Sequence, residues 1–299
     1  MEIPTVEFVF ALKKNLQSAR SKSMQLTAFV ALWKHRFHKY SHLTYALLSA
    51  YYHANRLRIL KLRSRKPVVA LVRTEHFGDI VALEPLSRLA RRGYPNAYIV
   101  WFVKPAFREL VATNPNIDET FEEFCVTERK ILLGSGVFRA VHELQFSNNN
   151  YCVYAQRFYE NERATQLGIN VFTYFEFGNL LEVFAKVGGL PIPEASQPQL
   201  YLQSNHRERV AAYVLDAPFV VIHCQSNYAP KDWPAANWRV LLDWLLGSYP
   251  LLHVIEVGLS SNLAYAHPRY RTLCGEFSLL ETAALIEKAT FFIGLDSGP

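Results

Sequence analysis

Cysteine is scarce in this chain, which has four cysteines among 299 residues. They lie far apart, and no C-x-x-C pair occurs, so the pattern argues against a zinc knuckle or a disulfide framework. It fits a reducing cytoplasm, and we expect a cytoplasmic protein. We interpret all four as buried structural thiols: Cys125, Cys152, Cys224 and Cys274.

Long apolar runs are also absent. No uncharged apolar stretch reaches the roughly 18 residues that a membrane-spanning helix needs. The N-terminus has no compact apolar segment followed by a small-residue cleavage site, so we do not expect secretion. Half of the residues are nevertheless hydrophobic, which is enough for a large core, and the length favours two domains.

Acidic residues are nearly missing from residues 1–66, which hold 13 Lys and Arg against Glu2 and Glu7, a net charge of +11. Apolar residues recur there at helical spacing, so we predict a basic helical extension. It could pack on the main body with a solvated basic face, or dock peripherally on an anionic membrane surface such as the inner face of the cytoplasmic membrane. We do not expect it to bind nucleic acid, because no known reading module accompanies the charge.

Three histidines of this extension, His35, His38 and His42, share one helix face. A metal site is conceivable there, but no cysteine or acid lies nearby in the sequence to complete it. We interpret them as titratable members of the basic face.

After Pro67, short apolar runs alternate with amphipathic segments, as in parallel α/β folds. We predict a Rossmann-like domain over 67–190, a linker and connecting helix over 191–216, and a second Rossmann-like domain over 217–299, with a cleft between the two domains. The predicted strands are Val68–Val72, Ala97–Val103, Thr120–Cys125, Ala140–Phe146, Phe219–His223, Leu252–Val257 and Thr290–Leu295. The predicted helices are Ile80–Arg92, Pro105–Ala112, Arg207–Leu215, Trp238–Leu246 and Leu279–Ala289.

Three polar groups follow predicted strands. Asp79 begins a helix and is either an N-cap or a catalytic base. Lys231, before Trp233-Pro234, either reaches a phosphate or is a surface lysine. Asp296-Ser297-Gly298 either offers backbone N–H groups to an anion or forms a simple turn. Their order along both halves is more specific than any one of them.

These motifs resemble glycosyltransferase family 9, the heptosyltransferases of lipopolysaccharide synthesis. The resemblance covers roughly residues 67–299. The segments that carry it are Val69–Thr74, Gly78–Val81, Pro85-Leu86, Tyr94-Pro95, Asn114–Asp118, Val221–His223, Lys231–Pro234, Ala284–Ile286 and Phe292–Pro299.

The resemblance implies a GT-B fold and an inverting transfer of a heptose-like sugar from a nucleotide-sugar donor, typically ADP-linked, to an anionic glycolipid acceptor such as the lipopolysaccharide core. It implies no metal and no further cofactor, and no DxD-like pair stands at a suitable strand end. Asp79 would be the general base, and Lys231 would neutralise the departing diphosphate. The remaining residues assigned to the donor are Ser226, Asp296, Ser297 and Gly298, and those assigned to the acceptor are Thr74, Glu75, His76 and Gly78.

The family usually continues beyond the Asp-Ser-Gly motif with a histidine and a small-residue helix. This chain ends at Pro299, so we expect its C-terminal domain to be incomplete. Cys224–Asn227 also stands where the family has a Pro-Gly pair, and Leu259–Asn262 lacks a glutamate that is frequent there. These departures favour one alternative, a non-catalytic binding or scaffold protein derived from a glycosyltransferase.

Overall fold

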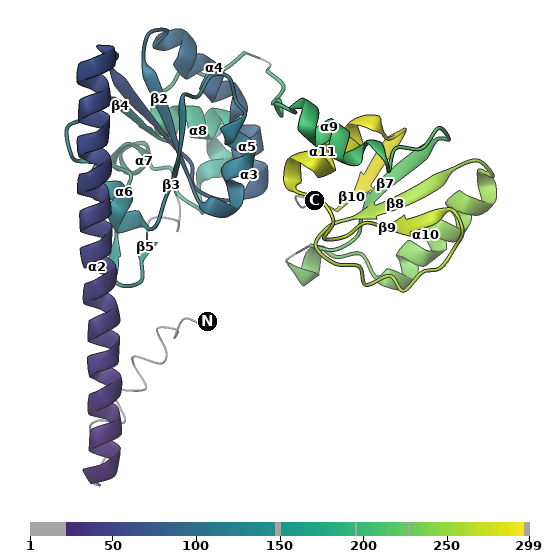
Figure 1. The fold of residues 1–299 in the computed structure, drawn as a ribbon, viewed down its shortest axis with the longest axis horizontal. Helices are drawn as coiled ribbons and strands as arrows, with labels where there is room; N and C mark the ends of the chain where they lie inside the picture. The colour runs from purple at the N-terminus through teal and green to yellow at the C-terminus, as the bar shows by residue number, and fades with distance from the viewer. Residues whose placement is uncertain (1–21, 147–150, 195, 227, 296–299) are drawn as a thin grey trace. The chain divides into compact units, whose positions relative to one another are not determined.

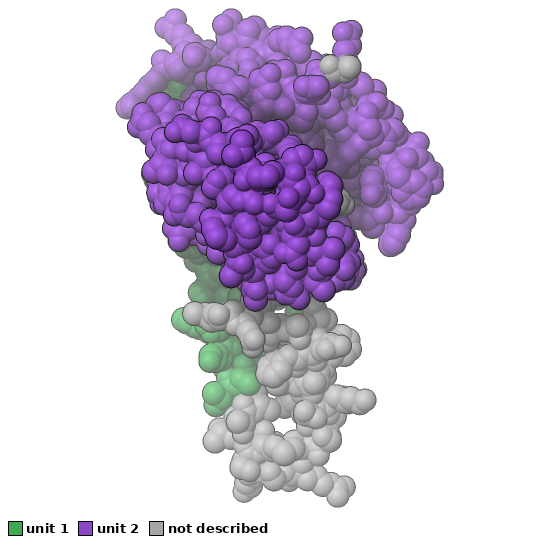
Figure 2. All heavy atoms as spheres, turned by 90° about the vertical axis from the view of Figure 1, so that its right-hand side faces the viewer, with its two compact units in different colours: residues 1–60, 124–137, 150–159 green, residues 61–123, 138–149, 160–299 purple. Residues whose placement is uncertain are grey.

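The computed structural model describes residues 22–146, 151–194, 196–226 and 228–295. The chain divides into two compact units, which are described separately and coloured in Figure 2. Unit 1 comprises residues 1–60, 124–137 and 150–159. Unit 2 comprises residues 61–123, 138–149 and 160–299.

Unit 1 is built on one long helix, α2 (Lys22–Ser64), of 43 residues (Figure 1). A stripe of small and apolar side chains spaced three or four residues apart is buried along it: Ala46, Ala50, Ala54 and Leu57. This is the spacing at which residues share one helix face. None of the helices in the described residues combines the length and the apolar character needed to cross a membrane.

Two short elements complete unit 1: α6 (Val126–Leu133) and the antiparallel hairpin of β5 (Tyr151–Cys152) and β6 (Arg157–Phe158). The Ser49 hydroxyl donates to the Glu128 carboxylate at 2.5 Å, and Arg58 donates to the Ser135 carbonyl at 2.7 Å. The helix α2 is therefore tied to both ends of α6. The predicted strand Thr120–Cys125 was wrong in its second half, because the Cys125 thiol accepts from Glu128 N–H and caps α6.

Unit 2 contains two parallel sheets of four strands each, in the orders β3-β2-β1-β4 and β10-β7-β8-β9. The first comprises β1 (Val68–Val72), β2 (Tyr98–Val103), β3 (Glu119–Glu122) and β4 (Phe138–Glu143). The second comprises β7 (Phe219–His223), β8 (His253–Val257), β9 (Tyr270–Thr272) and β10 (Phe291–Gly294). In the first sheet the edge strand β4 lies beside β1, and in the second sheet the edge strand β10 lies beside β7. Each sheet therefore has a topological switch point, which is where open α/β sheets bind their ligands.

The remaining helices of unit 2 join and cover these strands. They are α3 (Phe77–Ala82), α4 (Glu84–Gly93), α5 (Arg108–Ala112), α7 (Glu162–Leu167), α8 (Leu180–Gly188), α9 (Ser204–Ala211), α10 (Ala235–Ser248) and α11 (Leu279–Lys288), with 3-10 turns η1 (Pro105–Phe107), η3 (Tyr174–Phe177) and η4 (Ala229–Lys231). The α/β class with parallel sheets, predicted from the alternating pattern, is confirmed.

Alternation along β7 explains how the second sheet is covered. Val220 and Ile222 pack with α10, whereas Val221 packs with residues of α9 and α11. Successive side chains of a strand point to opposite faces, so a fully apolar strand buries both. The edge strand β10 is less covered, with Phe291 44% and Phe292 39% exposed.

The segment after β1 differs from the prediction. The predicted helix Ile80–Arg92 begins earlier, at Phe77, and is divided at Leu83 into α3 and α4. Pro85 near the start of α4 has no N–H to donate, so a new helix starts there rather than continuing α3. Asp79 consequently lies inside the first turn of α3, and the residue at the N-cap is His76.

Candidate functional site

Asp79 forms an ion pair with Arg73, the first residue after β1. The Arg73 side chain is 3% exposed and that of Asp79 is 24% exposed. The guanidinium also lies over the Phe184 ring, 4.6 Å from its centre, and its Nε donates to the Glu75 carbonyl at 3.2 Å. Asp79 is thus not the side-chain N-cap that the local sequence allowed. It is a partly exposed carboxylate held by a buried cation, a pairing that sequence reasoning missed.

Burial lowers the pKa of Arg73, and the nearby Asp79 carboxylate opposes that shift. An arginine with an ordinary pKa above 12 remains charged at neutral pH. The charge-assisted hydrogen bond therefore has a fixed direction, from the guanidinium to the carboxylate.

Thr74 lies at the switch point of the first sheet, where β1 and β4 end side by side. Its backbone N–H and its hydroxyl both donate to Gln145 Oε1 at 2.7 Å. Asn161 then donates to the Gln145 carbonyl at 2.8 Å. Because Thr74 is fully buried, these bonds hold the loop that leads to Asp79 rather than offering the hydroxyl to solvent.

The other residues assigned to the acceptor come shortly after Thr74 in the sequence. Glu75 forms an ion pair with Lys104 at the end of β2. His76 is exposed and has a φ of 69°, in the region that non-glycine residues rarely adopt. At Gly78 an added Cβ would meet no atom within 4 Å. The loop therefore has open space at Gly78, the residue before Asp79 in the sequence.

In the second sheet, Lys231 ends the turn η4 after β7 and is exposed. The turn is held by Asp232, whose Oδ1 accepts from both the N–H and the hydroxyl of Ser226 at 2.7 Å. These bonds, the hydroxyl first, lower the pKa of Asp232. The Trp233 ring packs edge-on against Trp238 with centres 5.2 Å apart. Ser226, assigned to the donor, thus shapes the same loop that carries Lys231.

Two buried polar residues, His223 and Glu256, lie on the strands β7 and β8 of this sheet. His223 is buried at the end of β7, and burial lowers its pKa. Glu256 on β8 is also buried and accepts from the Tyr270 hydroxyl at 2.5 Å. Gly258 has a φ of 138°, and a Cβ there would lie 3.1 Å from the His223 ring, so only glycine fits.

The other donor residues, Asp296, Ser297 and Gly298, lie outside the described residues. In the chain they follow β10, which pairs with β7 in parallel, Gly294 opposite His223.

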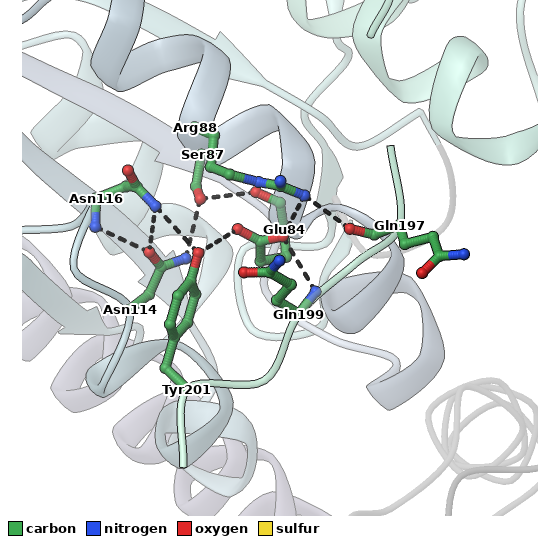
Figure 3. Close-up of polar contacts among 8 residues, drawn as sticks. All are labelled: Glu84, Ser87, Arg88, Asn114, Asn116, Gln197, Gln199 and Tyr201. Carbon is green, nitrogen blue, oxygen red and sulfur yellow. Dashed lines mark hydrogen bonds and ion pairs between the residues drawn. The ribbon is translucent and has the colours of Figure 1, made fainter. Parts of the chain in front are cut away.

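A polar network anchors the segment between the two sheets (Figure 3). The buried Glu84 carboxylate accepts from the Tyr201 hydroxyl at 2.7 Å and from Gln199 N–H at 3.1 Å, and it pairs with Arg88 at 2.9 Å. Burial, followed by the hydrogen bond to Glu84, raises the pKa of Tyr201 to about 12. Asn116 donates to the same hydroxyl at 3.3 Å. Part of the Asn114–Asp118 motif therefore secures the linker.

Unit 1 contains a cluster that the sequence analysis did not predict. His42, Cys125 and Cys152 bring one ligand atom each to within 4.8 Å of one another. The interpretation of all four cysteines as buried was wrong for two of them, because Cys125 and Cys274 are only half-buried. The cluster was missed because the search for metal ligands considered only residues close together in the sequence. His42, Cys125 and Cys152 come from α2, the start of α6 and β5.

Two parallel Rossmann-like sheets, joined by an anchored linker, have the architecture of GT-B glycosyltransferases. Residues 178–299 match the family model of glycosyltransferase family 9 (heptosyltransferase). The match covers the C-terminal part of the chain, which is therefore similar to this family of glycosyltransferases. No curated protein matches the chain significantly.

Solved structures share the fold at low sequence identity. A family 9 glycosyltransferase from Veillonella parvula has a TM-score of 0.56 and 15% identity, over 78% of this chain and 76% of that one. The E. coli ADP-heptose lipopolysaccharide heptosyltransferase II has a TM-score of 0.51 and 16% sequence identity, over 78% of this chain and 80% of that one. The structure of the E. coli heptosyltransferase WaaC with ADP-2-deoxy-2-fluoro heptose has a TM-score of 0.52 and 16% sequence identity, over 77% of this chain and 83% of that one. At these identities the likeness is one of fold.

Proposed function

We propose that this protein is an inverting glycosyltransferase that moves a heptose-like sugar from an ADP-linked donor to a hydroxyl of an anionic glycolipid, such as the lipopolysaccharide core, without a catalytic metal. The observation that carries the proposal is the Asp79 carboxylate, which is partly exposed and is held by an ion pair with the buried Arg73. The fold shared with two heptosyltransferases supports the same reaction class.

In this mechanism the acceptor hydroxyl attacks the anomeric carbon of the donor. The new C–O bond forms as the bond to the diphosphate breaks, and the hydroxyl proton passes to Asp79. A carboxylate can act as this base because the hydroxyl becomes acidic as the new bond forms. The role of Arg73 is to hold the Asp79 carboxylate in the orientation that the attack requires.

The departing diphosphate needs a positive charge. Lys231 provides it from an exposed position on a loop that Asp232 and Ser226 hold in shape. Asp296, Ser297 and Gly298, which follow β10 in sequence, are proposed to contact the nucleotide and its phosphates.

The exposed part of α2 supports an acceptor located at a membrane surface. Trp33, Phe37 and Tyr40 recur at helical spacing and are 53%, 72% and 65% exposed. Lys34 and Arg36 are exposed between them. Aromatic side chains together with basic ones favour adsorption to anionic headgroups. This peripheral contact is part of the proposal.

Asp79→Asn tests the reaction. We expect the rate of sugar transfer to a lipopolysaccharide-core acceptor, measured by mass spectrometry, to fall by roughly 100-fold or more. Calorimetry should show that the binding of ADP-heptose is unchanged. The matched control is Asp118→Asn, which removes a carboxylate paired with Arg91 near the opposite end of the same sheet. Turnover retained in Asp79→Asn would reject its role as the base. Donor binding without turnover in the unaltered protein would favour the non-catalytic alternative.

Sedimentation with liposomes tests the membrane contact separately. We expect binding to vesicles containing anionic phospholipid to exceed binding to neutral ones, and to weaken in Trp33→Ser/Phe37→Ser. The control Trp244→Ser removes an equally exposed aromatic ring, on α10. Equal sedimentation with neutral and anionic vesicles would reject the contact.

A further inference from the structure

The His42, Cys125 and Cys152 cluster joins three elements of unit 1. His42 lies on α2, Cys125 caps α6, and Cys152 ends β5. The Cys152 side chain is buried and the other two are half-buried. The His42 ring is held by stacking on Tyr154, 4.2 Å between centres, and by Phe124 at 4.6 Å. The imidazole is thus positioned by packing.

The donor set and its spacing suit a transition-metal ion. Thiolate and imidazole are the ligands that Zn²⁺ and similar ions prefer. In tetrahedral sites, bonds of about 2.3 Å to sulfur and about 2.0 Å to nitrogen place neighbouring ligand atoms about 3.3–3.8 Å apart. The three atoms here lie within 4.8 Å of one another, so small side-chain rotations would close the site.

The surroundings provide a second, independent observation. His42 Nε2 is buried and has no hydrogen-bond partner, and an unsatisfied buried polar atom costs about 1–3 kcal/mol. Each sulfur already accepts a backbone N–H, Cys125 from Glu128 at 3.5 Å and Cys152 from Ala155 at 3.4 Å. Such outer-shell bonds orient metal ligands.

We propose that His42, Cys125 and Cys152 bind one Zn²⁺-like divalent ion, with a water molecule or small donor in the fourth position. The ion ties α2 to α6 and to the hairpin β5–β6, together with the Ser49–Glu128 and Arg58–Ser135 hydrogen bonds. Its role is structural, within unit 1, and it is independent of the proposed transfer reaction.

The first experiment measures binding directly. The full chain is purified under reducing, metal-free conditions and titrated with Zn²⁺, and separately with Co²⁺ as a spectroscopic probe. We expect one equivalent to bind, with thiolate-to-cobalt charge-transfer absorption and a higher Tm with Zn²⁺ than with a chelator. Absence of stoichiometric binding would overturn the proposal.

Substitutions identify the ligands. His42→Gln, Cys125→Ser and Cys152→Ser should each weaken Zn²⁺ binding by roughly 100-fold or more, because even outer-shell changes cost 10–100-fold. The matched controls His38→Gln, exposed one turn earlier on α2, and Cys274→Ser should bind normally. Binding unaffected by the cysteine substitutions would overturn the proposal.

A measurement on the unaltered protein guards against variants that fail to fold. Zn²⁺ should protect Cys125 and Cys152 from alkylation and leave the reactivity of Cys274 unchanged, as read by peptide mass spectrometry. A Cys125–Cys152 disulfide in protein purified anaerobically, or protection of neither thiol, would overturn the proposal.

Discussion

Arg73 donates to Asp79 from a position almost withdrawn from solvent, whereas the Asp79 side chain remains 24% exposed. The guanidinium is itself fixed by the Phe184 ring and by the Glu75 carbonyl. Arg73 therefore acts as a positioning residue in the proposed reaction, and Asp79 as the group that meets the acceptor.

Arg73→Lys should lower kcat by roughly 100-fold, because a lysine cannot reproduce the planar fork and a displacement of about 1 Å at the base costs that much. Donor binding should remain. The control Arg91→Lys alters a comparable arginine, which bonds Asp118 and the carbonyls of Asn116 and Ala97, and should change stability rather than kcat. A normal kcat in Arg73→Lys would show that the pair does not position the base.

His76→Gly should raise thermal stability slightly while weakening use of the acceptor. The φ of 69° strains histidine but suits glycine, and relief of such strain is worth about 1 kcal/mol. We expect a higher KM for the acceptor and an unchanged KM for the donor. Gln156→Gly, at a φ of 50° in the β5–β6 turn, should have the stability effect alone. A normal acceptor KM in His76→Gly would remove His76 from the acceptor site.

Tyr201→Phe should lower the free energy of unfolding by about 2 kcal/mol, the typical value of a hydrogen bond to a charged group away from solvent. The lost bond joins the linker to Glu84 (Figure 3). Tyr265→Phe removes a bond of the same length to Asp243 on an exposed surface and should cost less than about 1 kcal/mol. Denaturant unfolding measures both, and equal costs would contradict the anchoring role of the linker network.

The protein should lose stability as the pH falls below about 6.5, the ordinary pKa of histidine. Burial lowers the pKa of both His142 and His223 in the folded state, so below 6.5 the unfolded chain binds more protons than the folded one. Stability is full above pH 6.5 and declines toward the lowered pKa values, by up to about 1.4 kcal/mol per pH unit for each histidine.

Denaturant unfolding between pH 7.5 and 5 measures this decline. His142→Gln should make the decline shallower, because only one of the two titrating histidines, His223, then remains. The same slope in His142→Gln as in the unaltered protein would contradict the assignment.

Local sequence predicted the α/β alternation because the spacing of apolar residues in each segment indicates which faces of that strand or helix are buried. The continuous apolar run of Val68–Val72 can be satisfied only in a strand covered on both faces, which is where β1 lies. Local sequence placed the start of α3 wrongly, because His76 adopts a backbone conformation that no propensity favours. The pairing of Asp79 with Arg73 was missed because an ion pair across a turn has no periodic signature.

The sequence by itself determined the class of this protein: two parallel α/β sheets, a polar residue after key strands, and a basic amino-terminal segment. These follow from residue type and spacing, which act over a few positions. Only the tertiary structure decided that Gln145 holds Thr74, that Tyr201 secures Glu84, and that Cys125 and Cys152 meet His42. Contacts between residues far apart in the chain depend on how the elements pack, and no local pattern records that packing.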